Sequence, residues 1–270
     1  MLGLVAVGAG LRFVPGGPFS AADDPNPAAG PTMAPLPLHA ANITVDSVKT
    51  TGFLSWAVLD RRTNEIFGSS NMDATSSTAS LIKAWMAAQY LRTNDSPTQA
   101  KLSDLEIMIR DSDNDAADRT YSSIGGTPGI TKMVSVCSLT DSQAVQGWWS
   151  STLMSARDVV RLGQCIGDGR AAGPKWTQWL LDTMRKVRGD GDFGIRAAFP
   201  AAQRPQIAIK NGWLLSDDDN TWHTNCLAIG DTWVMSVMQR YPPTGVYQDD
   251  FQHTADVCQN LTKLLMSAPA

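Results

Sequence analysis

Residues 206–241 read QIAIKNGWLLSDDDNTWHTNCLAIGDTWVMSVMQRY. Three runs rich in apolar, aromatic and β-branched residues, at 206–215, 222–229 and 232–241, are separated by short turns, which is typical of antiparallel strands. The acidic run Asp217–Asp219 is predicted to be the solvated tip of a hairpin, because its spacing lacks the ligand alternation of a calcium loop. The stretch therefore predicts a three-stranded meander.

The signals on either side of the meander are those of two more strands and a block of helices. Residues 52–60 (GFLSWAVLD) and 65–69 predict two strands joined by a polar turn. From about residue 80 to 188 the apolar spacing becomes helical, and residues 247–266 predict a closing amphipathic helix. Start signals inside the helical block are Ser103 with Glu106, Thr127 with Pro128, and Ser155 with Asp158.

The order of two strands, helices, three strands and a helix predicts an α+β fold. A five-stranded antiparallel sheet built from both ends of the chain, flanked by the terminal helix and carrying an inserted all-helical domain, satisfies this order most simply. We predict a sheet domain from residues 45–78 and 189–270 and a helical domain from 79–188. Residues 1–44 are predicted to be a signal-like apolar segment followed by a Pro/Ala-rich tether.

The N-terminal residues indicate export. Leu2–Leu11 is apolar but too short to span a bilayer as a helix, and Ser20-Ala21-Ala22 resembles the cleavage end of a secretory signal, although no basic segment precedes it. Residues 22–41 lack periodic apolar positions, so folding is expected to begin near Val45. The protein is predicted to be extracellular or associated with the cell envelope, with the N-terminal segment either cleaved or retained as a membrane tether.

Charge and histidine content narrow the function classes. The formal net charge is -4, with 22 Lys and Arg against 26 Asp and Glu and no long block of either sign, so nucleic acid is not an expected partner. A Ser/His/Asp triad would need His223, which has no nucleophile elbow to serve. No metal or organic cofactor is implied, and we expect a monomer.

Four cysteines fit an exported protein. Cys137, Cys165, Cys226 and Cys258 show no C-x-x-C spacing, which argues against a zinc cluster. Three disulfide pairings are available. Cys137 with Cys165 and Cys226 with Cys258 are favoured because each pair joins elements expected to pack together, and four buried free thiols are the alternative.

Three short motifs carry candidate chemistry, and the first is Thr78-Ala79-Ser80-Leu81-Ile82-Lys83. Ser80 and Lys83 lie one helical turn apart, and Ser80 sits where unpaired backbone N–H groups stabilise an oxyanion. In a dry cleft Lys83 would act as a neutral base on the hydroxyl. The alternative is a surface lysine near a cap serine.

The second and third motifs are Ser112-Asp113-Asn114 and Lys210-Asn211-Gly212. Ser112 would relay a proton to the leaving group and Asn114 would bind a substrate carbonyl, whereas an ordinary helix N-cap is the alternative. Lys210 would attract a substrate carboxylate and Gly212 would let a ligand lie against the strand. The alternative there is a solvent-facing lysine with a glycine bulge.

Together, in this order and on these elements, the motifs resemble the three signatures of class A β-lactamases and penicillin-binding proteins, over residues 45–266. The resemblance implies an inserted helical domain and an oxyanion hole formed by the backbone N–H of Ser80 and one after Lys210, such as that of Trp213. Trp213 would also wall the cleft, unless it serves packing as the other tryptophans are expected to do.

The chain departs from the family pattern at three points. Class A enzymes release the acyl group with a glutamate between the second and third motifs, but the only two glutamates here, Glu65 and Glu106, both precede Ser112. Asp141, Gln143 and Gln146 occupy the corresponding segment. The 32-residue spacing from Ser80 to Ser112 is short for the family. Asn211 replaces the usual Thr or Ser that helps hold the substrate carboxylate, and its amide is expected to donate to the substrate instead.

The sequence therefore predicts a serine hydrolase or acyltransferase acting on a small-molecule or peptide amide, either a β-lactam or a D-Ala-type cell-wall peptide. An acyl-enzyme on Ser80 would be released slowly because the glutamate is missing. The alternatives are a catalytically impaired cell-envelope binding protein on the same fold, and an esterase.

Overall fold

The computed structural model describes residues 36–269, and in that part of the chain six strands form one antiparallel sheet of order β2-β1-β8-β7-β5, with β6 also on β7. The strands are β1 (Phe53–Asp60), β2 (Ile66–Gly68), β5 (Ala208–Ile209), β6 (Gly212–Ser216), β7 (Thr221–Ile229) and β8 (Trp233–Tyr241). β5 and β6 lie end to end along β7 in one unbroken register, Ala208 opposite Ile229 and Gly212 opposite Asn225. They fill one position, so the predicted five-stranded arrangement is confirmed.

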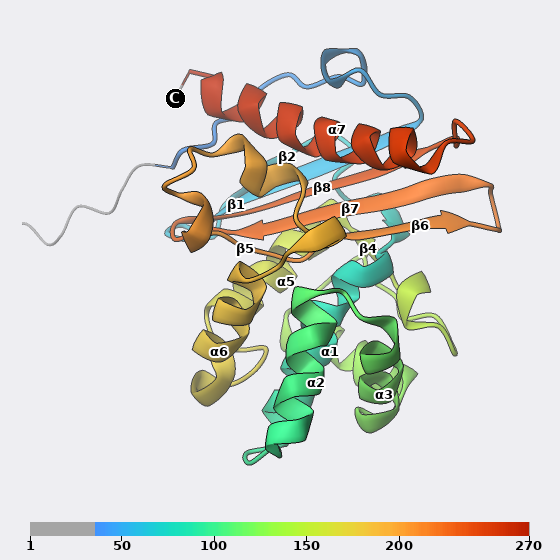
Figure 1. Cartoon of the computed structure of the whole chain (residues 1–270). Coiled ribbons are helices and arrows are strands. Elements are labelled where there is room, and N and C mark those ends of the chain that lie inside the picture. Colours follow the sequence, from blue (N-terminus) through green and yellow to red (C-terminus); the bar gives the residue numbers. More distant parts are fainter. Residues whose placement is uncertain (1–35, 270) are drawn as a thin grey trace, which may run out of the picture. The chain divides into compact units, whose positions relative to one another are not determined.

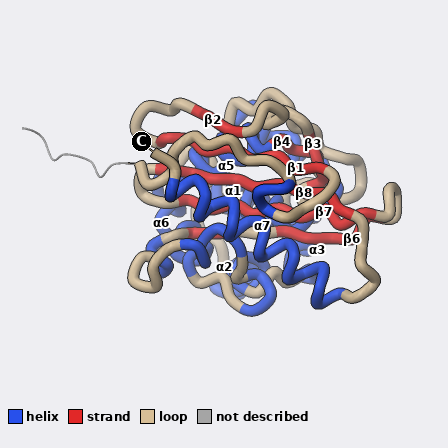
Figure 2. Tube along the Cα trace, turned by 90° about the horizontal axis from the view of Figure 1, so that it is seen from above, coloured by secondary structure: helices blue, strands red, loops and turns tan. Residues whose placement is uncertain are grey.

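The sheet joins the two ends of the described chain. β1 pairs with β8 along its whole length, from Phe53 opposite Arg240 to Asp60 opposite Trp233. Seen from above, β2 and β6 lie at opposite edges (Figure 2). A separate two-stranded sheet is made by β3 (Thr75–Ser77) and β4 (Leu153–Ser155).

Helices cover both faces of the sheet. α7 lies on one face and the other helices lie on the opposite side (Figure 1). Their bounds are α1 (Lys83–Thr93), α2 (Gln99–Arg110), α3 (Asn114–Ser123), α4 (Thr127–Val136), α5 (Ala156–Gly167), α6 (Pro174–Arg185) and α7 (Tyr247–Ser267). This arrangement confirms the predicted α+β class.

Two of the predicted helix starts are correct and one is wrong. α4 begins at Thr127-Pro128, and the Ser155 hydroxyl caps α5 by accepting the N–H of Asp158. Ser103, by contrast, lies inside α2. That helix begins four residues earlier, at Gln99, because the Thr98 side chain accepts the N–H of Lys101 and supplies the cap.

Both favoured disulfides are formed. Cys137 bonds to Cys165 and joins the end of α4 to α5, and Cys226 bonds to Cys258 and joins β7 to α7. No free cysteine remains in residues 36–269. The covalent links therefore run between elements that also pack through the core.

The packed chain begins earlier than the predicted Val45. Leu38 is fully buried, and the N–H of His39 donates to the carbonyl of Leu265 at 2.9 Å, so these residues dock on the last helix rather than forming a tether. The signal-like and cleavage-like segments predicted within residues 1–35 lie outside the described residues. None of the described helices combines the length and apolar character needed to cross a bilayer.

Candidate active site

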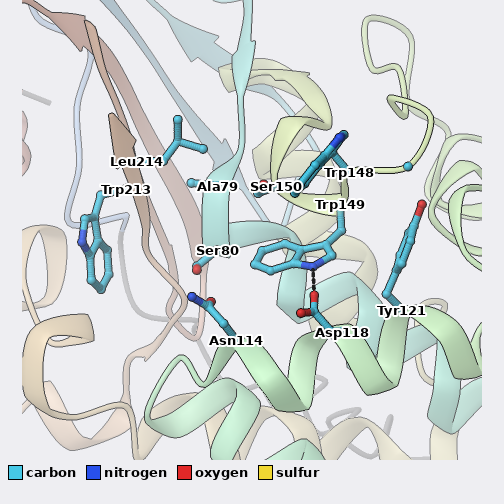
Figure 3. A pocket seen from close by; sticks show the side chains of 11 residues that line it. Ala79, Ser80, Asn114, Asp118, Tyr121, Trp148, Trp149, Ser150, Trp213 and Leu214 are labelled. Carbon is cyan, nitrogen blue, oxygen red and sulfur yellow. Dashed lines mark hydrogen bonds between the residues drawn. The ribbon is translucent and has the colours of Figure 1, made fainter. Parts of the chain in front are cut away.

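Ser80 lies in a strained turn at the mouth of a pocket. A 3-10 helix, Ala79–Ile82, follows β3 and leads directly into α1. Ala79 has φ of 47°, a left-handed conformation that costs a non-glycine residue about 1–3 kcal/mol and that clusters at functional sites. Ser80 lines a pocket of about 390 Å³ (Figure 3).

Gly212 brings β6 against the backbone of this turn. A Cβ at Gly212 would lie 2.7 Å from the amide nitrogen of Ser80 and 2.4 Å from the carbonyl oxygen of Thr78, so only glycine allows the approach. The missing side chain of Gly212 thus allows a close contact between two backbones, whereas the sequence predicted that it would let a ligand lie against the strand. No described group accepts a hydrogen bond from the N–H of Ser80.

Strand alternation sets the direction of the N–H of Trp213 on β6. Lys210 donates its N–H to Leu227 on β7, and the register continues through Gly212 opposite Asn225. Because N–H groups alternate in direction along an antiparallel strand, the N–H of Trp213 points to the opposite side of β6. That side does not pair with β7, and the N–H of Trp213 has no backbone acceptor among the described residues.

Lys83 is the first residue of α1 and is fully buried. Its ammonium nitrogen donates to the Ser112 carbonyl at 2.6 Å and to Asn114 Oδ1 at 2.7 Å, and it lies 3.4 Å from Ser112 Oγ. A direct hydrogen bond to Ser80 was expected and is not formed among the described residues. The amine points to the second motif instead, because the Ser112 carbonyl and the Asn114 amide oxygen supply the acceptors that a buried ammonium needs.

The second motif divides into a structural residue and two site residues. Asp113 caps α3 by accepting the N–H of Ala116 at 2.7 Å, so the ordinary N-cap reading is correct for this residue. Ser112 has φ of 58°, and this turn directs it and Asn114 toward Lys83. Asn114 also lines the pocket with Ser80.

Lys210 completes a cluster of two buried amines. Its nitrogen donates to Ser112 Oγ at 3.0 Å and to the carbonyl of Asn211 at 2.8 Å, and its side chain is fully buried. The alternative of a solvent-facing lysine is therefore wrong. Ser112 Oγ lies between the two lysines, although neither lysine nor Ser112 contributes to the pocket lining.

Burial favours the neutral form of both amines. Desolvation lowers the pKa of Lys83 to about 8, against the opposing charges of Asp113 and Asp118. The pKa of Lys210 falls well below its ordinary value through desolvation and then through the nearby charge of Lys83. An amine that is neutral near pH 8 suits the role of a general base.

Asn211 does not reach the pocket. Its amide nitrogen donates to the carbonyls of Gly191 at 3.0 Å and Phe193 at 2.9 Å, and its oxygen accepts the N–H of Leu227. Both amide hydrogens of Asn211 thus bind the backbone of the segment from Gly191 to Phe193. Trp213 lines the pocket as predicted, while its ring packs on Phe193 and Phe251.

The opposite wall of the pocket is aromatic and was not predicted. Trp149 donates its indole N–H to Asp118 Oδ1 at 2.7 Å, and its ring lies 4.9 Å from the nitrogen of Lys83. Trp148, which is 70% exposed, and Tyr121 stand beside it (Figure 3). The sequence shows two adjacent tryptophans but gives no signal that α3 supplies a carboxylate to hold one of them.

Of the three candidate substitutes for the missing glutamate, Asp141 and Gln143 have structural roles, and Gln146 lines a different pocket from Ser80. Asp141 is paired with Arg157 at 2.9 Å and accepts the Ser155 hydroxyl, and Gln143 bridges to Leu153 through the backbone. Glu106 forms an ion pair with Arg110. Asp118 is the only carboxylate among the residues that line the described pocket. No described group of His, Cys, Asp and Glu residues has the arrangement of a metal site.

His223 lies between a serine and an aspartate, although the sequence predicted no Ser/His/Asp triad at this residue. Ser77 Oγ lies 2.6 Å from His223 Nδ1, and His223 Nε2 lies 3.0 Å from Asp219 Oδ2. Ser77 is only 7% exposed and does not line the pocket next to Ser80. The chain of hydrogen bonds ties the β6–β7 hairpin tip to β3.

Comparisons with known proteins agree with this fold. No protein-family model matches the chain. "Putative lipoprotein LppW" of Mycobacterium tuberculosis and of Mycobacterium bovis is 26% identical over 216 residues, covering 76% of this chain and 68% of the relative.

The similar solved structures include class A β-lactamases. L2 in complex with relebactam aligns with a TM-score of 0.64 at 17% identity, over 82% of this chain and 92% of that one. The extended-spectrum β-lactamase TLA-1 aligns at 0.62 and 14% identity, over 80% and 93%. A variant of the last common ancestor of Gram-negative class A β-lactamases aligns at 0.60 and 21% identity, over 78% and 91%. The chain therefore has the class A β-lactamase fold.

Proposed function

We propose that this protein is an exported serine acyl-transfer enzyme that forms an acyl-enzyme on Ser80 from a β-lactam or a D-Ala-type peptide amide. The observation that carries the proposal is that the buried amines of Lys83 and Lys210 meet Ser112 and Asn114 beside a pocket that Ser80 lines. Three motifs far apart in sequence meet there, on the fold in which such chemistry occurs. Export is supported by the two disulfides and by the lipoprotein relative.

The acylation step follows from these groups. Ser80 Oγ bonds to the carbonyl carbon while its proton passes to the neutral amine of Lys83, and the N–H groups of Ser80 and Trp213 stabilise the oxyanion. The amide C–N bond then breaks as Ser112 gives its hydroxyl proton to the leaving nitrogen, and Lys83 passes the proton taken from Ser80 on to Ser112 Oγ, 3.4 Å from its nitrogen. Catalytic hydrogen bonds often tighten only with substrate bound, so Lys83 is expected to approach Ser80 when Asn114 engages the substrate.

Covalent labelling tests this proposal. A fluorescent penicillin is expected to label the wild type and leave Ser80→Ala and Lys83→Met unlabelled, and intact mass should rise by one acyl group. Both variants should retain the wild-type circular dichroism spectrum. A folded wild type that shows no adduct after long incubation would contradict the enzyme proposal.

The second candidate is a cell-envelope binding protein that has lost turnover. The positions of the two glutamates favour this candidate, since both precede Ser112 and neither lines the pocket. Such a protein would bind penicillin or a D-Ala-D-Ala peptide without forming a covalent bond, measurable by calorimetry. Binding that persists unchanged in Ser80→Ala would favour this candidate over the enzyme.

A further inference from the structure

Trp149 separates the Lys83 amine from the space of the pocket. The indole belongs to a short 3-10 turn, Trp149–Ser151, which precedes β4. Figure 3 shows the ring reaching across the pocket, with its N–H edge at Asp118 and its other end toward Ser80. The ring face lies over the nitrogen of Lys83, 4.9 Å from it to the ring centroid.

Asp118 holds the ring of Trp149, and Thr152 holds the backbone that carries it. Asp118 accepts the indole N–H at 2.7 Å and forms no ion pair within residues 36–269, so its pocket-facing oxygen is directed to the tryptophan. In the turn that follows Trp149, the Thr152 hydroxyl donates to the Trp149 carbonyl at 2.8 Å, and the Thr152 carbonyl accepts the N–H of Thr78 at 2.9 Å. The turn that holds Trp149 is thus tied to the segment that holds Ser80.

Release of an acyl group by hydrolysis needs water where this ring lies. The water oxygen must bond to the ester carbon, the bond to Ser80 Oγ must break, and one water proton must pass through a base to that oxygen. Lys83 is a base within the site, and Asp118 is the only carboxylate lining the described pocket. The Trp149 ring covers the amine of Lys83, and its N–H occupies an oxygen of the Asp118 carboxylate.

We propose that Trp149, anchored by Asp118, shields the acyl ester on Ser80 from water, so that the acyl-enzyme persists and the site retains its acyl group. The inference rests on the proposed acyl transfer and adds a residue that sets the lifetime of its intermediate. Trp149 is therefore a positioning residue for the exclusion of water, while Lys83 and Ser80 perform the acylation.

Decay of the labelled protein tests the shield. Wild type is acylated with fluorescent penicillin, excess reagent is removed, and the adduct is followed by intact mass. Trp149→Ala is expected to shorten the half-life of the adduct by at least about tenfold. Trp149→Phe, which keeps a ring over Lys83, should stay within about threefold of wild type.

Two more variants keep the test decisive. Trp176→Ala removes a tryptophan from α6, away from the pocket lining, and should leave the half-life unchanged. Asp118→Ala leaves the loop sequence intact but frees the indole, and should also shorten the half-life. If folded Trp149→Ala and Asp118→Ala decay as slowly as wild type, the shield is wrong although acylation stands. If the wild type never forms an adduct, the proposed function itself fails.

Discussion

The nitrogen of Lys210, which lies between β5 and β6, donates to Ser112 Oγ at 3.0 Å across 98 residues of the chain. Lys83 approaches the same oxygen from α1 at 3.4 Å. Two buried amines that approach one hydroxyl cannot both carry a charge at low cost, since desolvation lowers the pKa of each and the charge of Lys83 lowers that of Lys210 further. We therefore expect at least one of Lys83 and Lys210 to be neutral.

The pH dependence of acylation should report this neutral amine. Desolvation lowers the pKa of Lys83 to about 8, and only the deprotonated form accepts the Ser80 proton. The rate of penicillin labelling should therefore rise roughly tenfold per pH unit below that value and level off above it. Stopped-flow labelling between pH 6 and 10 measures the profile.

Lys83→Arg is the control for this profile, because a guanidinium does not deprotonate in this range. The variant should label at least about 100-fold more slowly at every pH. A wild-type profile that is flat, or that falls as pH rises, would contradict the role of Lys83 as base.

Lys210→Met should separate stability from function. The fully buried amine loses its hydration on folding, and replacing it by an apolar side chain of similar length removes that cost. The free energy of unfolding is expected to stay equal or rise by about 1 kcal/mol, while the labelling rate falls at least about tenfold. Urea denaturation and labelling of the same preparation give both quantities.

The pH dependence of the unfolding free energy should differ between the wild type and Lys210→Met. The folded pKa of Lys210 lies below the unfolded value of 10.5, so between the two the unfolded chain binds the extra proton. Wild-type stability relative to Lys210→Met should therefore rise with pH and level off above 10.5. A difference that does not change with pH would mean that the folded protein keeps Lys210 charged.

Gly212→Ala tests the contact that brings β6 to Ser80. Its Cβ would lie 2.4 Å from the carbonyl oxygen of Thr78 and 2.7 Å from the nitrogen of Ser80. Strand and turn must separate, so we expect a loss of about 2 kcal/mol in unfolding free energy and at least about 100-fold in labelling rate. Gly189→Ala is the control: its missing Cβ has open space but its φ is 59°, so the variant should lose stability through backbone strain and still keep its label. Undiminished labelling in Gly212→Ala would exclude the oxyanion hole assigned here.

The backbone was predictable because periodicity is a local property. The strand predicted at 222–229 is β7 at Thr221–Ile229, and the helix predicted at 247–266 is α7 at Tyr247–Ser267. The disulfide pairing followed from which elements pack together.

The direction of individual side chains was less predictable, because it is set by competition among acceptors brought together only by folding. Lys83 turned to the carbonyl of Ser112 instead of Ser80, and Asn211 turned to two carbonyls that lie about 20 residues earlier in the chain. Trp149 was assigned to packing, since no pattern in the sequence ties it to Asp118 across 31 residues.

Ser77→Ala tests whether Ser77 or Ser80 is the nucleophile. The Ser77 hydroxyl lies 2.6 Å from His223 Nδ1, and removing it leaves a buried ring nitrogen without a partner, which costs about 1–2 kcal/mol. Ser77→Ala should therefore unfold at a lower urea concentration while keeping its penicillin label. Hydrolysis of a p-nitrophenyl ester, if present, should be lost in Ser80→Ala and in Lys83→Met but kept in Ser77→Ala. The reverse result, with hydrolysis lost only in Ser77→Ala and His223→Ala, would place the esterase chemistry on the His223 chain of hydrogen bonds and remove Ser80 from it.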